Sequence, residues 1–382
     1  MIKTLTPLIV TTLCLAVFKI IPKQTRPALP YLLFFSISIT SALGLTEALT
    51  GSHSSGTNPY LYGLSFYTAS IAFYLASQVK LKVNEALKFT NPLLLLTGPI
   101  ALFVKRAGQK TLRNRMNYYL PFILIGLFFF QIIASPLAQF FSLIEKTDLV
   151  SVLLFATIFE IFVYANFCGL SLIIYGMFGM FGYKIPLNFK QPFSSSNVVD
   201  FWKGWHTSLS TVLKVLFYTP LRKKSTQFVA LSGVFIASAL WHGVTLNFLI
   251  WGSFHAIAFW ISLVLLRNNI KVLPMVILIL GVIIGRLIFA DSNTDRLLEK
   301  LMFSYDGVGA FSFLLNVPNN SKAALALGIG LILIEFFFRK NRYVRKRNYK
   351  HLRSPIVLAL LLLIGTFLIT LTGGEYAVYG QR

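Results

Sequence analysis

Five histidines are the side chains of this 382-residue chain best suited to proton transfer, at positions 53, 206, 242, 255 and 351. Imidazole has a reference pKa of about 6.5, so it exchanges protons near neutral pH. His242 follows Trp241 at the end of an apolar stretch, where a histidine is costly unless it is buried in protein or lines a cavity. Position alone leaves two interpretations open, a general base and a core histidine hydrogen-bonded to a carbonyl group. Gly243, which has no side chain, would leave room for a substrate.

The other histidines differ in their surroundings. His206 stands in the run Trp-His-Thr-Ser-Leu-Ser, where it either packs its ring on the Trp205 indole or belongs to a functional site. His255 lies one helical turn after Trp251 in an apolar stretch, so we expect it to hydrogen-bond within a helix bundle. His53, in a Ser/Gly loop, and His351, in a cationic run, are expected to be solvated.

Motifs of several other site classes are missing from the sequence. Cys14 and Cys168 both lie in apolar stretches, which is typical of neither a disulfide framework nor a zinc site. There is no P-loop, no dinucleotide-binding glycine motif and no Gly-x-Ser-x-Gly elbow. The sequence therefore gives little support to a zinc site or to these other enzyme classes.

The elements that must position these histidines are membrane helices. Hydrophobic residues make up 56% of the chain and charged residues only 12%, against about 25% charged in soluble domains. The mean hydropathy is +0.71. The net charge of +23 would suggest a nucleic-acid partner in a soluble protein, but in a membrane protein the cations belong in cytoplasmic loops. The composition predicts an all-α multi-pass membrane protein, and we treat residues 1–382 as one domain.

A membrane span needs roughly 20 apolar residues. About ten candidate spans meet this need, at residues 2–21, 28–50, 60–79, 117–141, 149–180, 227–241, 248–266, 272–290, 323–338 and 355–372. The basic groups around 80–88 and 105–115 can both be cytoplasmic only if the short segment 91–104, broken by glycine and proline, is re-entrant.

The basic segment 183–224 is predicted to lie on the cytoplasmic side. Apolar residues recur at helical spacing from 198 to 217, which predicts an amphipathic helix at the membrane surface or in a bowl of protein. Ser196 or Asn197 would cap this helix and Asp200 would brace it. Elsewhere, Glu160 and Arg286 lie inside apolar spans, where they would pair with each other, line a polar tunnel or snorkel to the headgroups.

Several motifs occur in a fixed order between about residues 60 and 260. They are YGLSFYT at 62–68, GPI at 98–100, GYKIPLNFKQP at 182–192, DFWKGWHTSLS at 200–210, LWHG at 240–243 and WGSFH at 251–255. Together they make the chain resemble the membrane-bound O-acyltransferase family. The branch it resembles holds the bacterial alginate O-acetylase membrane subunit and the D-alanyl lipoteichoic acid transferase.

The resemblance implies helices around a central funnel or tunnel in the inner, cytoplasmic membrane. It implies acyl transfer from a cytoplasmic thioester, acetyl-CoA or an acyl carrier protein, to a hydroxyl of a cell-surface or exported glycan. We expect the acyl group to be acetyl, and a periplasmic or extracellular partner to complete the transfer. His242 would be the general base and His206 a second catalytic histidine. The expected substrate contacts are Trp205, Ser208, Trp241 and Asn188.

The chain departs from the family pattern at three motifs. Gly204 stands where the family has a second arginine before Trp-His, and the usual arginine after the Gly-Pro-Ile motif is missing, although Lys105 and Arg106 follow. Where the family has tyrosine and aspartate, the run 169–176 has Leu170 and Leu172, which puts the substrate in doubt and leaves a degenerate, inactive relative as one reading. D-alanyl transfer from a carrier protein to teichoic acid is an alternative function. A multi-pass transporter or flippase is another, since it would equally explain the spans, although no internal repeat is evident.

Overall fold

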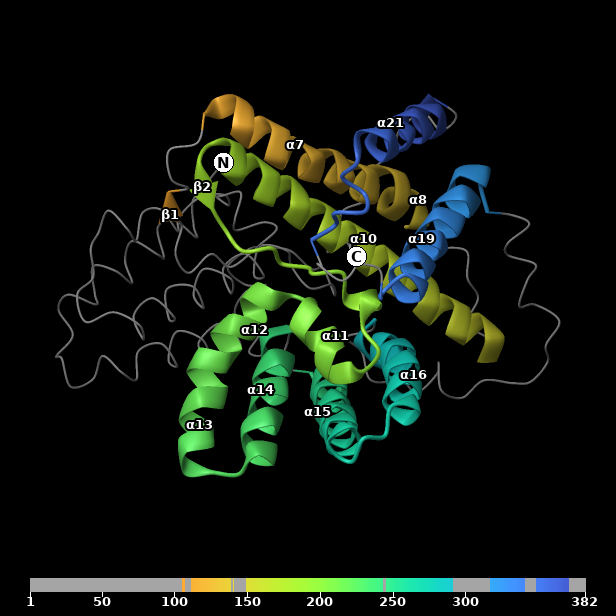
Figure 1. The fold of residues 1–382 in the computed structure, drawn as a ribbon. Helices are drawn as coiled ribbons and strands as arrows, with labels where there is room; N and C mark the ends of the chain where they lie inside the picture. Colours follow the sequence, from red (N-terminus) through yellow and green to blue (C-terminus); the bar gives the residue numbers. More distant parts are fainter. Residues whose placement is uncertain are drawn as a thin grey trace, which may run out of the picture.

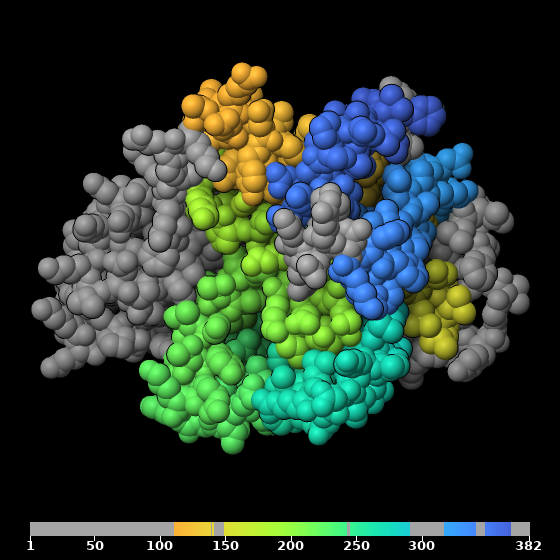
Figure 2. Space-filling model, viewed as in Figure 1, coloured from red at the N-terminus to blue at the C-terminus, as the bar shows by residue number. Residues whose placement is uncertain are grey.

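A computed structural model of the protein describes residues 105–106, 111–138, 140, 149–242, 245–290, 317–340 and 348–370. Apart from one pair of two-residue strands, the regular elements among these residues are helical. Figure 1 shows α10 running through the middle of the fold, with α7, α19 and α21 on one side and α11–α16 on the other. The same two groups of segments occupy opposite sides of the surface in Figure 2.

Five helical stretches of the described residues are long and apolar enough to cross a membrane. They are Leu112–Leu137, which joins α7 (Leu112–Leu127), a π-helical stretch (Phe128–Ala134) and α8 (Ser135–Leu137); α10 (Leu149–Met180); α15 (Leu246–Arg267); α16 (Val272–Phe289); and α19 (Asn319–Phe337). Each overlaps an expected span, which confirms a mostly helical, multi-pass membrane protein.

Two further expected spans are also apolar helices, but shorter ones. They are α14 (Gln227–His242) and α21 (Pro355–Thr370). The expected spans 2–21, 28–50 and 60–79 and the expected re-entrant segment 91–104 lie outside the described residues. The total of about ten helices and the central funnel therefore stay predictions.

Close helix packing fixes the central helix α10 against α7. A Cβ added to Gly126 on α7 would lie 2.6 Å from the carbonyl oxygen of Gly169 on α10. Small residues at such a crossing let the two backbones approach, as is common between membrane helices. On its other side α10 contacts α16, and α14, α15 and α16 pack against one another in chain order.

A short antiparallel strand pair joins two basic segments of the chain. Strand β1 (Lys105–Arg106) pairs with β2 (Tyr183–Lys184), with Lys105 opposite Lys184. The backbone pairing places both segments at the same end of the fold, as expected if both face the cytoplasm.

The expected single helix over 198–217 is wrong, because the structure breaks it at His206. Helix α11 (Val198–Gly204) and helix α12 (Thr207–Leu213) meet at a left-handed His206 with φ of 44°. A π-helical turn (Lys214–Tyr218) and α13 (Thr219–Lys224) follow. The break is held from outside the helix, since the Thr207 amide donates to the Asn188 carbonyl at 2.8 Å.

The start of α11 follows the prediction. The Asn197 side-chain oxygen accepts a hydrogen bond from the Asp200 amide at 2.8 Å, which caps the helix. The Asp200 carboxylate in turn accepts from the Asn197 amide group and from Lys203, both at 3.0 Å. Both the cap and the bracing role of Asp200 are confirmed.

Candidate active site

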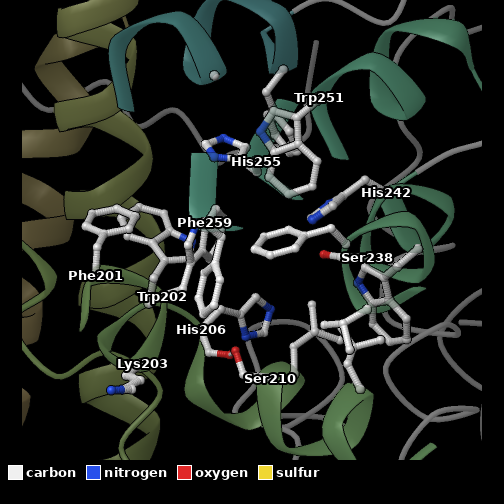
Figure 3. A pocket seen from close by; sticks show the side chains of 18 of the residues that line it. Phe201, Trp202, Lys203, His206, Ser210, Ser238, His242, Trp251, His255 and Phe259 are labelled. Atoms are coloured by element: carbon white, nitrogen blue, oxygen red, sulfur yellow. Dashed lines mark hydrogen bonds between the residues drawn. The ribbon is translucent and has the colours of Figure 1, made fainter. Parts of the chain in front are cut away.

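A cavity of about 770 Å³ lies between α10 and the group of helices α11–α16. Aromatic and aliphatic side chains make up most of its wall. The charged side chains and the histidine, asparagine, glutamine and serine side chains that line it are Glu160, Asn166, Lys203, His206, Ser210, Lys214, Gln227, Ser238, His242, His255 and Arg286. Three of the five histidines thus border one cavity, although they come from separate elements (Figure 3).

The Asn188 side chain holds His206 in place through a hydrogen bond. The Nδ1 atom of His206 lies 3.0 Å from Oδ1 of Asn188. That oxygen also accepts hydrogen bonds from the Ser208 hydroxyl at 2.7 Å and from the Ser208 amide at 3.4 Å. Because Oδ1 can only accept, His206 Nδ1 must carry the proton of this bond. The neutral ring therefore keeps its lone pair on Nε2.

Burial keeps His206 uncharged. The residue is only 6% exposed, and the Phe167 ring meets its ring edge-on at 4.8 Å. Burial, reinforced by the nearby His242, lowers the pKa of His206 to about 3. The imidazole is therefore neutral at physiological pH and can accept a hydrogen bond.

His242 lines the cavity from α14. It is the last residue of α14, and its ring meets the rings of Phe289 and Trp251 edge-on at 4.8 and 5.5 Å. Figure 3 shows its ring pointing into the cavity from the side opposite Trp202. Gly243 lies outside the described residues. The aromatic packing fixes the direction of the ring without enclosing it, since His242 also lines the cavity.

The expectation for His255 is wrong in one respect. Its Nδ1 is buried and has no hydrogen-bond partner within the described part of the chain. The ring is held instead by aromatic contacts, with Trp202 and Trp251 each at 5.0 Å. His255 is thus positioned by packing.

Glu160 and Arg286 form an ion pair, so the first of their three expected arrangements is confirmed. Their side chains are 5% and 11% exposed and both line the cavity. The Arg286 guanidinium also lies 5.3 Å from the ring centres of Trp205 and Phe289. The pair joins α10 to α16 at the cavity wall.

A family model for membrane-bound O-acyltransferases matches residues 60–272. The chain belongs to the membrane-bound O-acyltransferase family. This confirms the resemblance drawn from the motifs, and the matched range contains both His206 and His242.

Curated relatives agree with the family assignment. A peptidoglycan O-acetyltransferase of Helicobacter pylori is 33% identical over 178 residues, which are 42% of this chain and 33% of that protein. A probable alginate O-acetylase AlgI of Pseudomonas aeruginosa is 33% identical over 153 residues, 37% of this chain and 29% of that protein. A teichoic acid D-alanyltransferase of Bacillus subtilis is 27% identical over 150 residues, 35% of this chain and 38% of that protein. Each match spans well under half of the relative's length.

The remaining predicted site residues of this family member fall into two groups. Trp205 and Trp241 line the cavity together with the two histidines. Asn188 and Ser208 are not among the lining residues: Asn188 contacts His206, and Ser208 donates hydrogen bonds to Asn188. These two positions can orient a histidine, whereas the two tryptophans can touch a ligand.

Two of the outlying histidines were expected to be solvated. His351 is not, because it is half-buried and its Nδ1 lies 3.3 Å from the side-chain nitrogen of Gln191. His53 lies outside the described residues. In the run 169–176, which departs from the family pattern, Leu170 lines the cavity and Leu172 is buried in the core.

Asn166 is a cavity residue that sequence reasoning missed. It is buried in α10 and lines the cavity beside Phe167. A signal was present, because a carboxamide in the middle of a 32-residue apolar helix is a functional candidate by itself.

Proposed function

We propose that this chain is an O-acyltransferase that moves an acetyl group from a cytoplasmic thioester to a hydroxyl of a cell-surface or exported glycan. The observation that carries the proposal is that His206, which is buried, and His242, which is half-buried, come from different elements and line one cavity. Family membership supports acyl transfer as the reaction. The names of the relatives, which mention peptidoglycan, alginate and teichoic acid, support an envelope polymer as the acceptor.

The reaction needs one proton to move twice. The acceptor hydroxyl attacks the thioester carbonyl carbon, the C–O bond forms and the C–S bond breaks. His242 takes the hydroxyl proton as a general base and returns it to the departing sulfur, so that ester and thiol are the products. No metal or bound cofactor is required for these steps.

His206 has the orienting role in this proposal. Its Nε2 lone pair accepts a hydrogen bond from an N–H or O–H group of the bound substrate. Donation from Nε2 to the thioester carbonyl would require a charged ring, which burial disfavours. Asn188 and Ser208 act through His206 by fixing the position of its proton.

For the membrane arrangement around this site, we adopt what the family resemblance implies. We propose about ten spanning helices around a funnel in the cytoplasmic membrane, with the donor entering from the side of the basic segment 183–224. A periplasmic or extracellular partner would receive or complete the transfer.

D-alanyl transfer from a carrier protein is the alternative favoured by the similarity to a teichoic acid D-alanyltransferase. Family membership gives a transporter no support.

Label transfer in membranes tests the proposal. Membranes that contain the full chain would be incubated with acetyl-CoA radiolabelled in the acetyl group, and in parallel with a D-alanyl carrier protein. We expect the label to move from acetyl-CoA to polymeric glycan. Label that moves only from the carrier protein would select the alternative, and label that stays on both donors would overturn acyl transfer.

The link between Asn188 and His206 gives a further prediction. Asn188→Leu should lower turnover by about 10- to 100-fold, by analogy with the loss of a side chain that orients a metal-binding histidine. Ser208→Ala should cost less, because the Ser208 amide still donates to Asn188. Turnover would be compared at matched protein levels. Equal activity of Asn188→Leu and the parent would show that the proton position on His206 is irrelevant.

A further inference from the structure

Asn166 is a buried amide that the proposed reaction does not yet use. It is 1% exposed and lines the cavity from α10. Neither its side-chain oxygen nor its side-chain nitrogen has a hydrogen-bond partner within the described residues. The α10 lining residues nearest to it in sequence, Val163, Phe167 and Leu170, have no side-chain hydrogen-bonding group, and the remaining one, Glu160, is paired with Arg286.

Such a side chain lowers the stability of the fold. A buried polar group without a partner loses its hydrogen bonds to water and gains none in the protein, which costs free energy. A carboxamide has both donors and an acceptor that lose such bonds. Leucine is similar in size and would remove this penalty at a site surrounded by apolar groups. An asparagine at such a position points to a hydrogen-bond partner that arrives with a ligand.

Other polar atoms around the cavity are also buried without a hydrogen-bond partner among the described residues. Oε1 of Glu160, Nε1 of Trp202 and Nδ1 of His255 are buried and have no partner in the part of the chain that is described. They come from α10, α11 and α15, and all three residues line the cavity. Unpartnered donors and acceptors from three elements at one cavity indicate that polar groups of a ligand, or ordered water, occupy it.

We propose that Asn166 is a substrate-positioning residue, which binds a substrate group that both donates and accepts a hydrogen bond. The inference rests on the proposed acyl transfer, whose substrates carry two such groups. One is the amide in the arm that bears the thioester of coenzyme A or a carrier protein. The other is a hydroxyl of the glycan acceptor. Both match the paired donor and acceptor of a carboxamide.

The test compares Asn166→Leu with Ser171→Ala. Ser171 is a suitable control because it is also buried in α10 without a hydrogen-bond partner among the described residues, yet does not line the cavity. In detergent, the ligand-free Asn166→Leu protein should unfold at the same temperature as the parent or at a higher one. Its KM for one substrate should rise by about 10- to 100-fold, as expected for two lost neutral hydrogen bonds, while kcat stays near the parent value.

Measuring KM for each substrate shows whether Asn166 binds the amide of the donor or the hydroxyl of the acceptor. A raised KM for acetyl-CoA alone assigns Asn166 to the amide of the donor, and a raised KM for the glycan alone assigns it to the acceptor hydroxyl. Ser171→Ala should change neither KM. Unchanged KM values for both substrates in Asn166→Leu would overturn the proposal and leave a buried water as the partner.

Direct binding keeps this test separate from the reaction itself. Calorimetric titration of the detergent-solubilised full chain with coenzyme A, and with a glycan oligosaccharide, does not require turnover. Weaker binding of either probe to Asn166→Leu supports the inference even if the parent transfers no acetyl group. Binding of both probes that is the same in variant and parent overturns it. Asn166→Ala provides the same comparison if the leucine variant does not accumulate.

Discussion

Replacing His242 by glutamine is expected to lower acyl transfer by about 10²- to 10⁴-fold, the usual contribution of a general base, while the protein remains folded in the membrane. Glutamine keeps a polar side chain of similar reach but cannot take up a proton. The Phe289 and Trp251 rings that hold the imidazole would still surround the new side chain. The measurement is acetylated product per unit of membrane protein.

His351→Gln is the matched control for this variant. His351 is also half-buried, but it contacts Gln191 and is not among the cavity-lining residues. We expect its activity to stay close to that of the parent. Near-normal activity of His242→Gln, or equal losses in both variants, would remove His242 from the mechanism.

Arg286→Met is expected to destabilise the protein by about 3–5 kcal/mol, because it leaves the Glu160 carboxylate buried without its partner. Methionine retains much of the apolar packing against Trp205 and Phe289. The double variant with Glu160→Leu should recover most of the loss, since no buried charge is then left. Thermal unfolding in detergent measures the difference.

Lys203→Met is the comparison for an exposed ion pair. Lys203 pairs with Asp200 at 3.0 Å, and the two side chains are 66% and 45% exposed. Its loss should cost less than about 1 kcal/mol. Destabilisation by Arg286→Met no greater than that of Lys203→Met, or no recovery in the double variant, would contradict a structural role for the buried pair.

Long apolar stretches made much of the helical framework predictable. The expected span 149–180 coincides with α10, because an apolar run bounded by charged and polar turns has few alternatives in a membrane. The break at His206 was not predictable in the same way. The helical spacing of apolar residues continues across it, and the break depends on hydrogen bonds from residues 187–190, which lie well before it in sequence.

The candidate site was also only partly predictable from the sequence. His206 and His242 could be chosen from sequence because histidine is scarce in this chain and both stand in motifs that resemble those of the family. The contacts of their neighbours could not be settled from sequence. Asn188 was expected to touch the substrate but reaches His206 through the fold, and pairing of Glu160 with Arg286 was one of three open arrangements. His351 was misjudged because its cationic neighbours suggested solvent, whereas its contact with Gln191 is tertiary.

The most direct test of the shared cavity is the turnover of His206→Gln, His242→Gln and the double variant, measured together at matched protein levels. If both histidines act on the same bound substrates, their effects should not be additive, and the double variant should be about as slow as the slower single variant. Losses that multiply in the double variant, or a His206→Gln variant with unchanged turnover and donor affinity, would contradict a joint role for the two histidines.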